Sequence, residues 1–272
     1  MTLNSFILSM QSPPLPALGA LFLLLLAAYG VGTLLLRRFR RHGAVAMREF
    51  TAFVLGLDLL ALLFRLGERV VCTAPPAAPA AMLAIPAGYG VWILLTLLPA
   101  ACRRHWLLLL LVFAGAIWTL GSAFCMPYAW DEQVYQTALP FRYLASGSAA
   151  MALDNPYSAF PAMQHFLMMP AIRLGGIAMP RLLVWASYPI LFAWFFLALR
   201  RFGRLTAAAV TLALLLSPVV AAMNRENYAE PFIVLQLFAG ACAVRSFVSL
   251  RSAALLTGLF AGMAAAVKLT AG

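Results

Sequence analysis

Long apolar runs, separated by short polar or basic segments, cover most of this chain. A helix that crosses a bilayer needs about 20 largely apolar residues, and eight of the runs approach that length. We therefore predict an all-α fold, a polytopic transmembrane helix bundle of about eight spans. The predicted spans are Leu15–Leu36, Phe50–Leu66, Ala80–Ala101, Trp106–Phe124, Pro180–Leu199, Leu205–Ala222, Ala229–Phe247 and Ser252–Gly272.

Twelve of the 18 arginines lie in or beside those connections that would fall on one side of this bundle. They are Arg37, Arg38, Arg40, Arg41, Arg48, Arg103, Arg104, Arg200, Arg201, Arg204, Arg245 and Arg251. The positive-inside rule makes that side cytoplasmic, so we expect the segments Cys125–Met179 and Met223–Tyr228 to lie outside. Lys268 is the only lysine, and a basic set made almost entirely of arginine is typical of a GC-rich bacterial genome. We expect a multi-pass protein of the bacterial inner (plasma) membrane.

Composition supports a membrane protein and argues against a soluble one. Hydrophobic residues make up 64% of the chain and charged residues 10%, whereas about a quarter of a soluble domain is charged. The formal net charge of +11 comes from clusters between apolar runs, which attract anionic lipid headgroups, so we expect no nucleic-acid partner. The four cysteines show no metal-ligand spacing. A disulfide between Cys72 and Cys125 and free buried thiols both remain open, and we favour free thiols.

The long outer segment should contain two juxtamembrane helices. We expect the first at Gln133–Ser146, with Gly147 as its stop, and the second at Ala159–Leu174, broken near Pro170. A turn at Asp154-Asn155-Pro156-Tyr157 separates them. Both helices are too apolar to stand free in water, so we expect them to lie in the interface plane, against lipid or the bundle.

Several charged residues fall at the expected outer face. Asp131 and Glu132 follow the run Trp106–Phe124, where adjacent acids are often ordinary solvated boundary residues. Glu230 precedes Pro231 in the first turn of a predicted helix, where a carboxylate also stabilises the helix dipole. Lys268 lies in the last apolar run, and its alternative role is that of a lysine reaching out to the interface.

Two further polar residues lie in apolar surroundings. Asp58 falls inside the second predicted span, where an acid is either functional or hydrogen-bonded to a neighbouring helix, and we leave both alternatives open. His165 is a lone histidine in the outer segment, for which interfacial packing is favoured over metal ligation.

Three segments resemble a known family of enzymes. They read AWDEQVYQTALPFRYLASG, NYAEPFIVLQLFAG and GLFAGMAAAVKLTAG. In their order, their spacing and their shared side of the membrane, these segments resemble the motifs of the polyprenyl-phosphate-sugar-dependent membrane glycosyltransferases of the GT-C fold. Protein mannosyltransferases and lipid A aminoarabinose transferases belong to this family. The likeness implies a GT-C-like core at residues 106–272, preceded by extra transmembrane helices at residues 1–105.

The resemblance implies a glycosyltransferase with its active face outward. It would move a sugar from a polyprenyl-phosphate donor to a lipid, glycan or protein acceptor. Asp131 would be the general base, supported by Glu132, while Glu230 or Glu226 and Tyr135 would orient or support the acceptor.

The leaving phosphate of the lipid needs positive charge. Lys268 and Arg225 are the expected phosphate ligands, and Arg142 and Arg173 are alternatives. No cofactor is certain, but Glu132 is a candidate ligand for a divalent cation. Membrane lipids are the other expected partners.

Two departures from the family pattern lead to further expectations. The family usually reaches its Asp-Glu pair after one helix, whereas three more precede Asp131 here, and the family usually continues well beyond the lysine. We therefore expect an N-terminal portion of a longer enzyme, with little or no transferase activity by itself. The alternatives are a transporter or flippase for lipid-linked or anionic cargo, which should show repeat symmetry that we do not find, a noncatalytic assembly protein, or an inactive truncated remnant.

Overall fold

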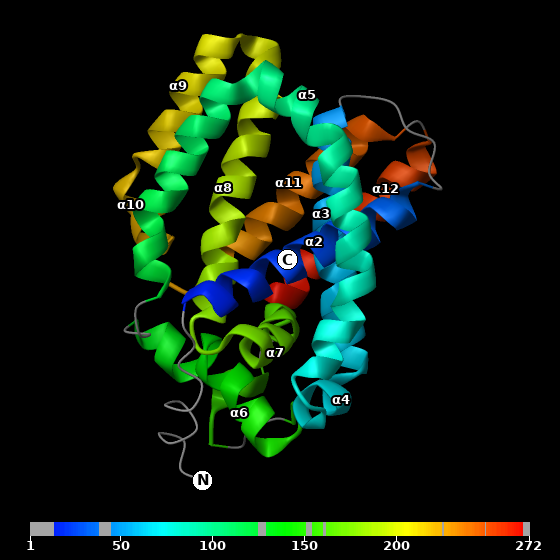
Figure 1. Cartoon of the computed structure of the whole chain (residues 1–272), viewed down its shortest axis with the longest axis vertical. Coiled ribbons are helices and arrows are strands. Elements are labelled where there is room, and N and C mark those ends of the chain that lie inside the picture. Colours follow the sequence, from blue (N-terminus) through cyan, green and yellow to red (C-terminus); the bar gives the residue numbers. More distant parts are fainter. Residues whose placement is uncertain are drawn as a thin grey trace.

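The computed structural model describes residues 14–37, 45–124, 129–150, 154–159, 162–224, 226–247 and 249–268. Helices account for nearly all of this part of the chain, and it contains no β-strand. The prediction of an all-α fold is therefore confirmed. In Figure 1, α4, α6 and α7 lie at one end of the molecule, and the connection between α8 and α9 lies at the opposite end.

The N-terminal helices pack closely through glycine. They are α2 (Pro14–Leu36), α3 (Val45–Leu66), α4 (Glu68–Thr73) and α5 (Ala77–Ala123). A Cβ atom on Gly32 of α2 would lie 1.7 Å from the carbonyl oxygen of Ala52 in α3, and one on Gly56 would lie 1.7 Å from that of Ala28. Only glycine permits such an approach of two helix backbones, which is the usual way in which membrane helices pack tightly.

The third and fourth predicted spans form one helix. α5 is 47 residues long, and its backbone stays helical through the arginines that were expected to form a connection. Two separate helices were therefore the wrong prediction, because arginine is a good helix former and does not end a helix. In Figure 1, α5 rises along one side of the molecule, bends sharply at the top in its middle part, and descends along the other side.

The sixth predicted span is divided in two. After α8 (Met179–Leu199) and the short η3 (Arg200–Phe202), the chain forms α9 (Arg204–Leu215) and α10 (Pro218–Met223). Ser217 between them has an extended backbone, with φ −61° and ψ 123°. The ring of a proline disfavours the helical region for the residue before it, so Pro218 explains the break.

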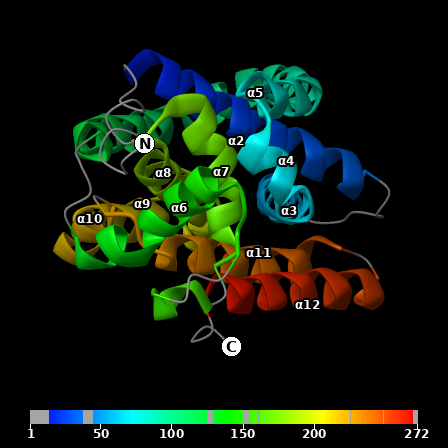
Figure 2. The same ribbon diagram turned by 90° about the horizontal axis from the view of Figure 1, so that it is seen from below.

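The last two helices, α11 (Glu230–Ser246) and α12 (Leu250–Val267), lie side by side (Figure 2). Four segments in the described part of the chain are long and apolar enough to cross a membrane. They are Pro14–Leu36, Ala77–Leu97, Met179–Phe202 and Leu250–Val267. These support a membrane protein, whereas a count of about eight spans remains a prediction. Other predicted spans are not among these four segments. α3 carries four charged residues, and α9 and α11 are shorter than 18 residues.

The outer segment folds as a π-helix and two α-helices. The π-helix η1 (Glu132–Gln136) and α6 (Ala138–Ser146) replace the single helix that was expected, and Gly147 ends α6 with φ 75°, as predicted. After the short η2 (Pro156–Ala159) comes α7 (Gln164–Gly175). The expected break near Pro170 is wrong, because α7 continues through this proline to Gly175, and Gly176 closes it with φ 82°. Pro170 lacks a backbone donor and crowds the preceding turn, but α7 is packed into the bundle and stays helical through it.

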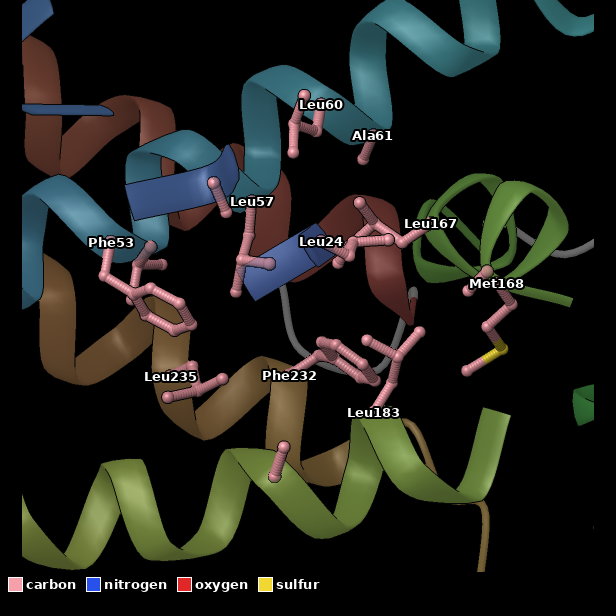
Figure 3. Close-up of a cluster of buried hydrophobic side chains, with 14 of the residues drawn as sticks. Leu24, Phe53, Leu57, Leu60, Ala61, Leu167, Met168, Leu183, Phe232 and Leu235 are labelled. Atoms are coloured by element: carbon pink, nitrogen blue, oxygen red, sulfur yellow. The ribbon is translucent and has the colours of Figure 1, made fainter. Parts of the chain in front are cut away.

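The hydrophobic core joins the first helices to the outer segment. In Figure 3, side chains from α2, α3, α7, α8 and α11 meet, among them Leu24, Phe53, Leu167, Leu183 and Phe232. α7 therefore packs into the bundle, and most of its side chains are buried. The expected domain boundary after residue 105 falls inside α5, so this division remains a prediction about family likeness only.

Candidate functional site

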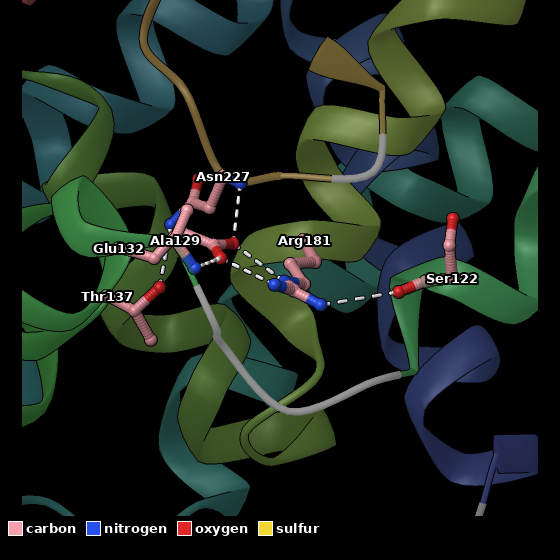
Figure 4. Close-up of polar contacts among 6 residues, drawn as sticks. All are labelled: Ser122, Ala129, Glu132, Thr137, Arg181 and Asn227. Atoms are coloured by element: carbon pink, nitrogen blue, oxygen red, sulfur yellow. Dashed lines mark hydrogen bonds and ion pairs between the residues drawn. The ribbon is translucent and has the colours of Figure 1, made fainter. Parts of the chain in front are cut away.

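Glu132 is the most buried of the predicted site residues, with none of its surface exposed. Arg181 binds both of its carboxylate oxygens, from Nε to Oε1 at 2.6 Å and from Nη2 to Oε2 at 2.5 Å. The backbone N–H of Asn227 donates to Oε1 at 2.6 Å, and that of Ala129 donates to Oε2 at 3.2 Å. Figure 4 shows Arg181 reaching across to Glu132. Four donors thus hold this carboxylate in one orientation.

The Arg181–Glu132 pair connects three segments that are far apart in sequence. Arg181 begins α8, Glu132 begins η1, and Asn227 belongs to the connection before α11. The side chain of Asn227 also donates to Thr137 Oγ1 at 3.0 Å (Figure 4). Sequence reasoning missed Arg181. The available signal was an arginine in the first turn of an apolar helix on the expected outer side, where it can meet an outer acid.

Asp131, by contrast, is only partly buried. The hydroxyl of Tyr135 donates to Asp131 Oδ2 at 3.0 Å, and the ring of Tyr135 stacks on that of Tyr157, with 4.8 Å between centroids. Burial, followed by the hydrogen bond to Asp131, raises the pKa of Tyr135 to about 12. Tyr135 is therefore a stable donor to the carboxylate at neutral pH. Trp130, which is 60% exposed, packs edge-on against Tyr157 beside them.

Lys268 and Glu230 form an ion pair, with Nζ 2.6 Å from Oε1. Each side chain is about one-third exposed, at 37% and 36%. Lys268 directly follows α12, which ends at Val267. A backbone bond from Met163 N to Ala266 O, at 3.0 Å, holds the start of α7 against this end of α12.

Two tyrosines, Tyr135 and Tyr228, link the predicted acids. The charge of Glu230 acts on Tyr135, the partner of Asp131, and helps to raise its pKa. The hydroxyl of Tyr228 is hydrogen-bonded to Glu226, which is the main cause of the raised pKa of Tyr228, and Asp131 contributes to the same shift. The fold thus gathers Asp131, Glu226 and Glu230 in one region.

The other predicted phosphate ligands are engaged elsewhere or lie outside the described residues. Arg142 pairs with Asp154 at 2.7 Å on the exposed surface, and Arg173 donates to the backbone carbonyls of Cys72 and Ala74. Arg225 lies outside the described residues. Of the predicted phosphate ligands that the structure describes, Lys268 is therefore the one that is paired with a predicted site acid, Glu230.

The histidine and one of the cysteines singled out in the sequence, His165 and Cys72, are both buried. His165 is buried, with its Nε2 3.4 Å from Gln136 Oε1, and burial lowers its pKa to about 3. Cys72 is a free buried thiol, whereas Cys125 lies outside the described residues. In the described part of the chain, no three His, Cys, Asp or Glu side chains are placed to hold a metal ion.

An apolar cavity of about 510 Å³ lies between α5, α8, α9 and α10. Its polar residues are Thr119, Tyr188 and Asn224, and the other lining residues include Trp118 and Phe192. Asn224 Nδ2 donates to Thr119 Oγ1 at 3.1 Å, while its Oδ1 is buried and meets no donor among the described residues. Asn224 stands three residues before Asn227, so the cavity adjoins the segment that holds Glu132.

Comparisons of this chain with protein-family models, curated proteins and solved structures find no match. The geometry of the described residues therefore carries the functional argument.

Proposed function

We propose that this protein is a membrane glycosyltransferase, which moves a sugar from a polyprenyl-phosphate donor to an acceptor at the outer face of a bacterial inner membrane. The observation that carries the proposal is the nearness of two pairs, Asp131 with Tyr135 and Glu230 with Lys268, since the charge of Glu230 acts on Tyr135. A partly buried acid and a nearby cation are the two charges that such a transfer needs.

Asp131 is the proposed general base. It takes the proton of an acceptor hydroxyl while that oxygen attacks the anomeric carbon, and the bond between this carbon and the phosphate oxygen breaks. The bonding electrons leave with the lipid phosphate. Tyr135 donates to Oδ2 of Asp131 and so orients the carboxylate, and Oδ1 is the oxygen that would take the acceptor proton.

Glu132 has a positioning role in this proposal. Its carboxylate is committed to Arg181 and two backbone N–H groups, so its charge holds the loop around Asp131 in place. The two neighbouring acids thus have different roles. Glu132 is buried and holds the local structure, whereas Asp131 remains accessible from the surface and can act as the base.

Lys268 is the proposed partner of the lipid phosphate. In the described structure its ammonium group binds Glu230, and a phosphate of greater charge can exchange for this carboxylate. Glu230, once released, would bind the acceptor together with Glu226. The exposed ring of Trp130 offers a surface on which a sugar can stack.

The apolar cavity supports a lipid-linked donor. Its volume lies within the range for small-molecule sites, and apolar side chains from four membrane-region helices line it. A hydrocarbon chain fits such a lining, and its phosphate end would point toward Asn224 and the acids beyond.

The alternative of a transporter receives less support. Asp58, the basic outer residues and the bundle architecture would also suit a transporter, but Asp58 is hydrogen-bonded to Gln236 in the packed core.

A pair of substitutions tests the proposal, made in the full product of the gene that encodes this chain. Asp131→Asn should reduce sugar transfer by about 10²–10⁴, the usual loss when a general base is removed. Asp154→Asn is the matched control, because Asp154 is an exposed acid of the same outer segment and its side chain pairs with Arg142, away from Asp131. Equal rates for the two variants would refute the role of Asp131.

A further inference from the structure

Asp58 and Gln236 meet in the interior of the bundle. Asp58 belongs to α3 and Gln236 to α11, and their exposed fractions are 5% and 4%. Gln236 Nε2 donates to Asp58 Oδ1 at 2.5 Å. No charged side chain in the described part of the chain forms an ion pair with Asp58.

This single bond leaves two oxygens without a donor. Asp58 Oδ2 and Gln236 Oε1 are both buried, and neither meets a hydrogen-bond donor from the described residues. An ionised carboxylate without a cation is very costly in such surroundings, and each unpaired buried acceptor adds a cost of its own.

A single proton on Asp58 would remove the uncompensated charge and pair both of these oxygens. When Oδ2 is protonated, the acid is neutral, and its O–H can donate to Oε1 while Nε2 donates to Oδ1. Carboxylic acids and primary amides are complementary in this way, because each offers one donor and one acceptor on the same edge.

We propose that Asp58 permanently binds one proton and forms a two-bond acid–amide pair with Gln236 that fastens α3 to α11. The pair lies six residues beyond Glu230 on α11, about 9 Å along the helix axis. It therefore holds the helix that carries Glu230 against the N-terminal helices. This inference does not depend on the proposed transferase activity.

The decisive variant is Asp58→Asn. The amide of asparagine offers the same donor and acceptor edge to Gln236, so the purified variant should unfold in detergent at the same temperature as the wild type. Asp58→Leu leaves the amide of Gln236 unpaired and should lower the unfolding temperature. Adding Gln236→Leu should recover much of that loss, because both polar groups are then gone.

Infrared difference spectroscopy supplies an independent readout that survives if Asp58→Leu fails to fold. The wild-type spectrum should contain the C=O band of a protonated carboxyl group that Asp58→Asn lacks. That band should persist when the buffer is raised from about pH 6 to about pH 9, since the group would titrate near pH 4 in water.

Three results would overturn the proposal. One is an Asp58→Asn variant as unstable as Asp58→Leu, which would mean that an ionised carboxylate is required. Another is the absence of the protonated-carboxyl band. The third is stability that depends on sodium in the wild type but not in Asp58→Asn, which would assign the free oxygens to a metal cation.

Discussion

Replacement of Glu132 by glutamine tests whether the Arg181–Glu132 pair organises the site. The variant keeps the size and one acceptor oxygen of the side chain but leaves the guanidinium of Arg181 buried without its counter-charge, with 2% of that side chain exposed. Breaking a buried ion pair from one side costs about 3–5 kcal/mol. Hydrogen bonds to charged groups contribute about 1.5–3 kcal/mol each, and two such bonds from Arg181 give a similar total.

Thermal unfolding of the purified protein in detergent measures this loss. A change of 3–5 kcal/mol should lower Tm by on the order of 10 °C, using the usual relation for domains of comparable size. Asp154→Asn breaks an exposed pair and should leave Tm unchanged. In a double-mutant cycle, Glu132→Gln combined with Arg181→Gln should show a coupling energy of about 1–3 kcal/mol. A wild-type Tm for Glu132→Gln, or purely additive effects, would refute this reasoning.

Three further predictions follow from the site and the outer segment. Tyr135→Phe removes the donor to Asp131 and should slow transfer by about tenfold or more, measured as kcat with unchanged protein yield; an unchanged kcat would exclude this role. His165 has a folded-state pKa of about 3, below its ordinary 6.5, so the unfolded chain binds its proton first and stability should fall as pH drops below about 6.5. Denaturant titrations of His165→Gln should show a shallower pH dependence, and an equal slope would contradict the assignment. In a variant without native cysteines, an impermeant thiol reagent applied from outside should label a cysteine at Ala145 and miss one at Arg201, and the reverse pattern would invert the proposed orientation.

Local signals in the sequence predicted the helices better than their connections. Gly147 ends α6 where expected, because glycine readily adopts the left-handed backbone that closes a helix. The Ser217-Pro218 break was also readable, yet the apolar run around it suggested one continuous span. The continuity of α5 could not be predicted from the arginine cluster, since arginine is compatible both with a cytoplasmic connection and with a helix.

The surroundings of the side chains in the candidate site could not be predicted from local sequence either. Sequence reasoning placed Asp131 and Glu132 together but could not assign them opposite environments, because burial is decided by residues far away in the chain. Glu132 is enclosed by Arg181, 49 positions later, and by Asn227, 95 positions later. Likewise, the partner of Asp58 lies 178 positions away on α11. Such contacts are set by how the helices pack, which the hydrophobic pattern does not specify.

The most direct test of the central claim follows the fate of the sugar. The full gene product is reconstituted in vesicles that contain a polyprenyl-phosphate donor with a labelled sugar, and an acceptor extract is supplied at the outer face. We predict that the label leaves the lipid and appears in a new glycosidic product, and that Asp131→Asn abolishes this transfer. If the labelled lipid instead crosses the bilayer intact, at a rate that Asp131→Asn does not change, the protein is a transporter and the proposal is wrong.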